Sequence, residues 1–97
     1  MSKSIENDTW VYVIIKNAGS NEHLAGLHDD VENLNFIPCF FEKDHAETCL
    51  AHMFDDDKDA YEVQAILYEE LSSYAKKNGF MVYTLDFKGN IINKIKP

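Results

Sequence analysis

Apolar residues along this chain fall into short runs, and the spacing within each run predicts the element that it forms. Residues 10–15 are β-branched or aromatic throughout and apolar at both alternating positions, which predicts a central strand buried on both faces. Residues 36–41 predict a second strand, in which Pro38 lacks the N–H that a strand ladder needs. We therefore expect this strand to have one free or bulged edge near the proline.

The C-terminal half predicts further strands. Residues 80–87 predict a third strong strand, expected to pair with residues 10–15, and residues 88–90 turn the chain into a last strand over residues 91–95. Residues 61–66 alternate between polar and apolar positions and suggest a strand. A helix that runs on into the next segment is the alternative for these six residues.

Two segments have the spacing of amphipathic helices. Asp44 followed by Glu47 resembles a capping box and opens a helix over residues 45–54, which ends at the acidic run that follows. Residues 67–78 form the clearest helix, with glutamates in the first turn, lysines in the last turn and Gly79 as a stop signal. The apolar stripe of the first helix consists of Ala46, Cys49, Leu50, Met53 and Phe54. That of the second consists of Leu67, Leu71, Tyr74 and Ala75.

Residues 22–35 leave two structures open. Four apolar side chains at helical spacing favour an amphipathic helix, whereas Gly26 and the pair Asp29 and Asp30 disfavour one. The apolar positions are Leu24, Leu27, Val31 and Leu34. We expect an irregular or short-strand segment, with the helix as the alternative.

Several short motifs follow one another along residues 10–87. They are Val11-Tyr12-Val13 with Asn17-Ala18-Gly19, Gly26-Leu27-His28, Phe40-Phe41-Glu42 with Asp44-His45-Ala46, and Glu69-Glu70-Leu71 with Gly79-Phe80. In this order they resemble a small uncharacterised family, a domain of unknown function found mainly in cyanobacteria and plastids. The resemblance implies that residues 26–28 are extended. It implies no chemistry, because the family has no established activity.

The elements together predict a single α+β domain over residues 1–97, with residues 1–8 as a flexible end. The expected architecture is a mostly antiparallel sheet of four to five strands with two helices on one face, in a ferredoxin-like or split βαβ arrangement. If both helices cover one face, the apolar side chains on the other face are exposed. A homodimer is the expected remedy.

Charge argues against one class of partner. The chain has nine lysines, no arginine and seventeen acidic residues, which gives a net charge of −8. Residues 22–62 hold twelve acids and two lysines, a local balance of −10, whereas residues 69–97 hold three acids and five lysines. Because nucleic-acid binding relies on cations that neutralise phosphates, we expect no nucleic-acid partner and a largely solvated acidic face.

The length of the apolar runs and the two cysteines indicate where in the cell we expect the protein. Residues 10–15, the longest clean apolar run, are far too few to span a bilayer, and residues 1–8 lack the apolar core of a signal peptide. We therefore expect no membrane partner. Cys39 and Cys49 lie in apolar segments, and a chain that builds its own core needs no disulfide framework, so we expect reduced thiols and a cytoplasmic location.

His45, Cys49 and His52 are the sharpest chemical candidates. Spacings of four and three residues place them on one helical stripe, and imidazole and thiolate groups suit zinc or copper. Cys39 in the preceding strand is a further possible ligand. However, Cys49 also belongs to the apolar stripe, and the sequence lacks the closely paired cysteines of a closed zinc site. We therefore expect no metal and no other cofactor, and a core role for Cys49.

The acidic run offers a second candidate site. Asp55, Asp56 and Asp57 are candidate partner-binding residues at the most acidic point of the chain. The run begins with the spacing of a calcium loop, but Ala60 and Ile66 stand where such a loop needs glycine and glutamate. We expect a solvated acidic loop that attracts basic partners.

Catalytic signals are the weakest. Cys49 could be paired with His45 or His52, and His28 lies beside Asp29, but neither pair belongs to a diagnostic motif. We expect a non-catalytic binding or regulatory module that acts through protein–protein contacts, with itself or with another protein. The alternatives are a metal-binding protein that uses the His/Cys helix face, and an acidic inhibitor or immunity-type protein for a basic partner.

Overall fold

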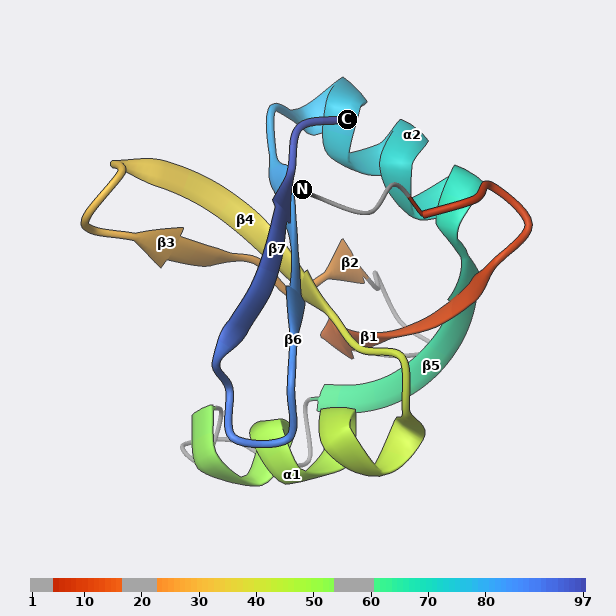
Figure 1. Cartoon of the computed structure of the whole chain (residues 1–97), viewed down its shortest axis with the longest axis vertical. Helices are drawn as coiled ribbons and strands as arrows, with labels where there is room; N and C mark the ends of the chain where they lie inside the picture. The colour runs from red at the N-terminus through yellow and green to blue at the C-terminus, as the bar shows by residue number, and fades with distance from the viewer. Residues whose placement is uncertain (1–4, 17–22, 54–60) are drawn as a thin grey trace.

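The chain folds into strands and helices that alternate along the sequence. A computed structural model describes residues 5–16, 23–53 and 61–97, and within these ranges it contains seven strands and two helices (Figure 1). In chain order they are β1 (Trp10–Lys16), β2 (His23–Leu24), β3 (Leu27–Asp29), β4 (Leu34–Cys39), α1 (Lys43–Met53), β5 (Tyr61–Leu67), α2 (Tyr68–Asn78), β6 (Met81–Leu85) and β7 (Ile91–Ile95). Neither helix is long and apolar enough to cross a membrane within the described ranges.

The strands form two sheets, of three and four strands, that meet at one backbone bridge. The first has the order β2-β1-β5 and is antiparallel throughout. The second has the order β3-β4-β6-β7, in which only β4 and β6 are parallel. Tyr12 of β1 and Phe40, just after β4, exchange N–H···O=C bonds of 2.8 and 2.9 Å. The end of β4 therefore continues from the second sheet onto an edge of the first.

The two helices lie on opposite sides of the strands, with α2 at the top and α1 at the bottom of the view in Figure 1. Val11 and Val13 of β1 pack in one buried cluster with Leu71 of α2. Ile14, the next residue of the strand, packs in the other cluster with Cys49 of α1. Because successive side chains of a strand point to opposite faces, each face of the central strands receives its own helix.

This layering confirms the α+β class and the mostly antiparallel pairing, and it corrects two expectations. The described strands form two sheets instead of one sheet of four to five strands, and the two helices do not share a face. The physical reason is the apolar character of residues 10–15 at both alternating positions, since each position meets a different helix. Because both faces carry a helix, an open apolar face gives no reason for a homodimer. The ferredoxin-like or split βαβ arrangement is not confirmed.

Strand pairing also differs from the expectation that residues 80–87 pair with residues 10–15. β6 pairs in parallel with β4 and antiparallel with β7. Both edges of β1 are already occupied, one by β5 and the other by β2 and Phe40, so β6 has no place beside β1. Residues 22–35, in contrast, form the predicted short strands in their described part, as β2, β3 and the start of β4.

Helix α2 begins against the segment that precedes β1. Its N-cap residue, Leu67, offers no side-chain hydrogen bond. Instead the N–H of Tyr68 donates a 2.8 Å bond to the carbonyl of Thr9, which satisfies one of the N–H groups that a helix start leaves unpaired. At the other end the predicted stop is confirmed, because Gly79 adopts a φ of 78° that residues with a Cβ rarely adopt.

Candidate functional site

The candidate metal ligands on α1 contact other parts of the protein. Cys49 is buried, and its thiol donates a weak 3.6 Å hydrogen bond to the carbonyl of Asp86 in the turn after β6. The His45 ring lies 5.8 Å from the Phe87 ring, centroid to centroid. His52 is exposed, with Nδ1 3.3 Å from the carbonyl oxygen of Thr48. All three side chains lie near Phe87, whose carbonyl oxygen is 4.0 Å from the Cys49 thiol and which lines one pocket together with Cys49 and His52. Each side chain makes its own contact with the protein.

Charge and burial place both thiols in their neutral form. Burial, and secondly the negative charge of Asp86, raise the pKa of Cys49. Cys39 is fully buried in the cluster on the α2 side, and burial raises its pKa to about 12. Cys39 and Cys49 are free thiols on opposite faces of the strands. Among the described residues, no three metal-ligating side chains lie close enough together to hold an ion.

The other predicted site, Asp55, Asp56 and Asp57, lies outside the described residues. Before it in sequence, Glu42, which precedes α1, and Asp44 and Glu47 of α1 are exposed, so the acidic region includes a solvated part of the fold.

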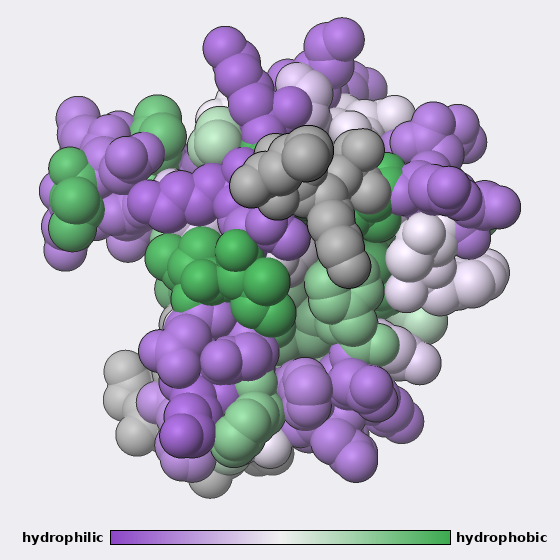
Figure 2. Space-filling view, in the orientation of Figure 1, coloured by the Kyte–Doolittle hydropathy of each residue, from purple (hydrophilic) through white to green (hydrophobic). Residues whose placement is uncertain are grey.

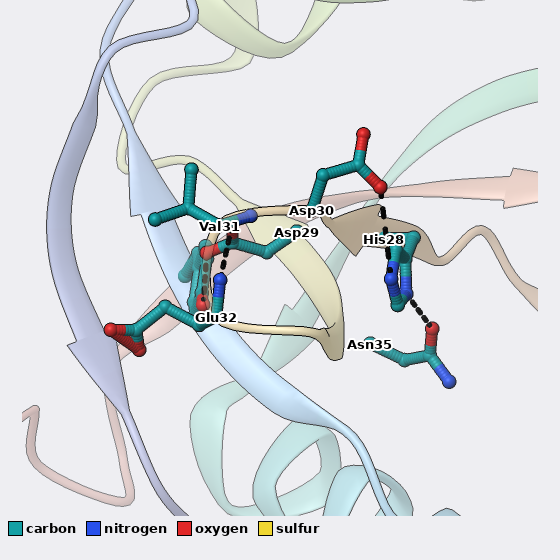
Figure 3. Close-up of polar contacts among 7 residues, drawn as sticks. His28, Asp29, Asp30, Val31, Glu32 and Asn35 are labelled. Atoms are coloured by element: carbon teal, nitrogen blue, oxygen red, sulfur yellow. Dashed lines mark hydrogen bonds and ion pairs between the residues drawn. The ribbon is translucent and has the colours of Figure 1, made fainter.

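A polar network that the sequence did not suggest centres on Asp29, at the end of β3. One carboxylate oxygen accepts hydrogen bonds from the backbone N–H groups of Val31 and Glu32, at 3.0 and 3.3 Å, and so forms the turn between β3 and β4 (Figure 3). The other accepts a 2.8 Å bond from the Tyr83 hydroxyl on β6 and lies 3.4 Å from Nζ of Lys94 on β7. The network joins the β3–β4 hairpin to β6 and β7.

The network has the electrostatics of a structural anchor. The bond from Tyr83 and the turn N–H groups lower the pKa of Asp29, with Lys94 contributing. Burial, and then the Asp29 carboxylate, raise the pKa of Tyr83 to about 12. The Tyr83 ring stacks on Phe36 with centroids 4.1 Å apart, and Lys94 Nζ lies 5.4 Å from its centroid. Tyr83 is therefore held as a neutral donor and Asp29 as a charged acceptor.

His28 does not join this network. Its Nδ1 lies 2.8 Å from Oδ1 of Asn35, across the hairpin, and its Nε2 lies 3.7 Å from Oδ1 of Asp30 (Figure 3). His28 and Asp29 are neighbours in a strand, so their side chains leave on opposite faces. Adjacency in sequence therefore does not bring the His28 and Asp29 side chains together.

A pocket of about 330 Å³ lies between α2 and the first sheet. Its apolar floor includes Val13, Ile15 and Leu24. The polar lining residues are His23, Gln64, Glu70 and Tyr74.

The edges of the sheets offer a different kind of site, because an edge strand presents unpaired N–H and C=O groups. Backbone hydrogen bonds show which way β1 faces. Tyr12 directs both backbone groups to Phe40, and the carbonyl of Ile14 accepts a 2.8 Å bond from the N–H of Ala25. These even-numbered residues of β1 therefore point away from β5, and the odd-numbered residues bond to β5.

The register between β1 and β5 then determines whether the backbone N–H and C=O groups of each β5 residue point toward β1 or toward the outer edge. Val13 of β1 lies opposite Gln64, so Gln64 bonds inward. Its neighbours Val63 and Ala65 direct their N–H and C=O groups to the outer edge, since these groups alternate between the two edges of an antiparallel strand. In the described part of the chain, nothing bonds to the outward groups of these two residues. β5 curves along the right side of the view in Figure 1.

The other edges carry features that discourage pairing. β2 and β3 are only two and three residues long. β7 has a register shift at Leu85 of β6 and carries Lys94, and bulges and lysines are common protections of edge strands. β5 has seven residues in continuous register with β1, and its sequence contains no proline, glycine or lysine.

Exposed apolar side chains gather elsewhere. Ile91 and Ile92 of β7 are 45% and 53% exposed, and Phe87 in the preceding turn is 50% exposed. Figure 2 shows hydrophobic surface over β7 and at the tip of the β3–β4 hairpin. Because the bulge and Lys94 protect the β7 edge, these side chains form an apolar surface at a place where we expect no further strand to pair.

Comparison with protein-family profiles, with curated proteins and with solved structures finds no match for this chain. The resemblance to the cyanobacterial and plastid family therefore stays a prediction.

Proposed function

We propose that the protein is a non-catalytic binding module that acts through protein–protein contacts, and that the outer edge of β5 receives an extended segment of its partner. The observation that carries this proposal is the outward direction of the backbone groups of Val63 and Ala65 on a long edge strand without protective features. Addition of a strand to such an edge is a common mode of peptide recognition, in which main-chain hydrogen bonds supply affinity.

The chemistry of the remaining candidates supports a binding role. A nucleophile or metal ligand at Cys49 would have to be a thiolate, yet burial and Asp86 raise its pKa. The Asp29 carboxylate and the Tyr83 hydroxyl hydrogen-bond to each other and connect β3 to β6, which is a structural role. A different partner, with basic side chains beside its extended segment, would be attracted by the exposed acidic side chains Asp44 and Glu47 of α1.

The experiment compares tagged wild-type protein with Ala65→Pro and Ala65→Thr in pull-downs from the native host. Proline removes an outward N–H but no hydrogen bond of the β1–β5 ladder, and proline is tolerated at such edge positions. Threonine keeps the N–H and the strand propensity. We expect a specific partner to be lost with proline and retained with threonine.

Hydrogen exchange then locates the contact. The amides of Val63 and Ala65 should become protected when the purified partner is added, while the inward amide of Gln64 is protected throughout. A partner that binds without protecting the outward amides would show that the site is elsewhere.

A further inference from the structure

We propose that the segment received by β5 is β5 of a second copy of this chain, paired antiparallel about a two-fold axis at Gln64. This inference rests on the proposed function of the β5 edge and names its partner. The product is a continuous sheet of six strands, β2-β1-β5 from one copy followed by β5-β1-β2 from the other. Closed two-fold symmetry makes the same surface serve both copies.

The backbone of β5 is self-complementary in this register. Val63 and Ala65, which both direct their backbone groups outward, flank Gln64 symmetrically. With Gln64 opposite Gln64 of the second copy, Val63 lies opposite Ala65 and the two residues exchange both N–H···O=C bonds; symmetry repeats the exchange. A slip of one residue would place outward groups opposite inward ones. A slip of two would shorten the overlap of the strands.

The side chains fit the same register. Glu62 is the only charged residue of β5, and the register places it opposite Ile66 of the second copy. The two Glu62 residues are then four positions apart along the strand, about 14 Å, beyond the screening length of about 8 Å at physiological salt. Like charges therefore do not meet at the interface.

Apolar contact and a hydrogen-bonding side chain complete the match. Val63 and Ala65 share one face of β5 and form, with their counterparts, a group of four apolar side chains across the junction. On the other face, Gln64 donates a 2.7 Å bond from Nε2 to Glu62. Its amide oxygen is left to meet the Gln64 amide of the second copy on the axis.

The test uses the full chain in three measurements. Sedimentation equilibrium over a range of concentrations should show a monomer–dimer equilibrium. Hydrogen exchange should show the amides of Val63 and Ala65 protected at high concentration and unprotected after dilution, with the Gln64 amide protected at both. Native Cys39 and Cys49 are buried, so a cysteine introduced on β5 reports its own neighbours under mild oxidation.

Gln64→Cys should form a disulfide-linked dimer, because residues in a non-hydrogen-bonded pair have Cα atoms about 4.5 Å apart, within disulfide range. Glu62→Cys is the matched control on the same strand and face. Its counterpart should be about 14 Å away, so it should not cross-link.

A monomer at all concentrations, a dimer whose β5 outward amides exchange freely, or faster cross-linking at position 62 than at position 64 would each overturn self-pairing. If the protein stays monomeric but another protein protects the amides of Val63 and Ala65, the proposed function stands and only the identity of the partner is wrong. If nothing ever protects these amides, both proposals fail.

Discussion

Tyr83 and Asp29 are 54 positions apart in sequence, and a 2.8 Å hydrogen bond joins the hydroxyl of one to the carboxylate of the other. Asp29 also forms the turn of the β3–β4 hairpin, and Lys94 of β7 approaches the same carboxylate oxygen. This one contact therefore connects the hairpin, which projects to the left in Figure 1, to the far strands of its sheet. The stability of the second sheet should depend on it.

Tyr83→Phe should lower the free energy of unfolding by about 2 kcal/mol, since hydrogen bonds to charged groups contribute roughly 1.5–3 kcal/mol. Chemical denaturation followed by circular dichroism measures the change. Tyr74→Phe is the matched control, because in the described part of the chain the Tyr74 hydroxyl has no hydrogen-bond partner. Equal losses in the two variants would show that the Asp29 contact contributes no special stability.

The same pair predicts that its contribution to the stability of the fold is lost both in acid and in alkali. The pKa of Asp29 is lowered by folding, so its contribution is present above the unfolded pKa of about 4 and is lost as pH falls below it. Folding raises the pKa of Tyr83 to about 12, so its contribution is present below the unfolded pKa, which is about 10, and is lost as pH rises through 12.

The stability difference between wild type and Tyr83→Phe should therefore be constant between about pH 5 and 9 and shrink on both sides. Urea denaturation from about pH 3 to about pH 12, within this range and on both sides of it, measures the difference. In an Asp29→Asn background, the effect of Tyr83→Phe should no longer decrease at low pH. A difference that stays constant into strong acid and strong alkali would contradict the linkage.

Thr84→Val should stabilise the protein. Thr84 is fully buried on β6, and in the described structure its hydroxyl has no hydrogen-bond partner. Valine has nearly the same shape and removes the cost of burying that hydroxyl, so a gain of about 1 kcal/mol is expected. Thr48→Val is the control, because the Thr48 hydroxyl is exposed and donates to the carbonyl of Asp44 at 2.9 Å. A loss of stability in Thr84→Val, measured by thermal unfolding, would indicate that the hydroxyl has a partner.

Elements with strong local signals could be predicted from the sequence. The helix expected at 67–78 and the strand expected at 91–95 match α2 and β7 closely. In both, the signals are local: charges in the terminal turns, Gly79 after the helix and the Lys88-Gly89-Asn90 turn before the strand. Such signals do not depend on what the element packs against.

Strand pairing and the Asp29 network depend on distant residues and could not be predicted. Whether β6 can join β1 depends on the edges that β2, Phe40 and β5 occupy. The sequence drew attention to His28 beside Asp29, but neighbours in a strand face opposite ways, and the true partner of Asp29 is Tyr83. The alternation of residues 61–66 indicated a strand, yet only the register with β1 shows which of its groups face outward.

The thiols should be unreactive in the folded state. Cys39 and Cys49 are buried with raised pKa values, so both should react slowly with a water-soluble disulfide reagent and rapidly after denaturation. Protein purified without a histidine tag should contain no stoichiometric zinc by elemental analysis. A full equivalent of zinc that disappears in the His45→Ala, His52→Ala double variant would instead establish the α1 face as a metal site.

Salt should distinguish a second copy from a basic partner. Each chain carries a net charge of −8, so two copies repel each other, and added salt should strengthen self-association by screening this repulsion. Changing Asp55, Asp56 and Asp57 to asparagine brings the charge to −5 (−8 + 3) and should act in the same direction at low salt. A basic partner predicts that both added salt and the triple variant weaken binding, because attraction to the acidic region would be screened or removed and association slowed.

Sedimentation of wild type and the triple variant at low and high salt measures self-association. A dimer that weakens severalfold with salt, and weakens again in the triple variant, would show that attraction between charges of opposite sign holds the copies together, and would count against pairing at the β5 edge.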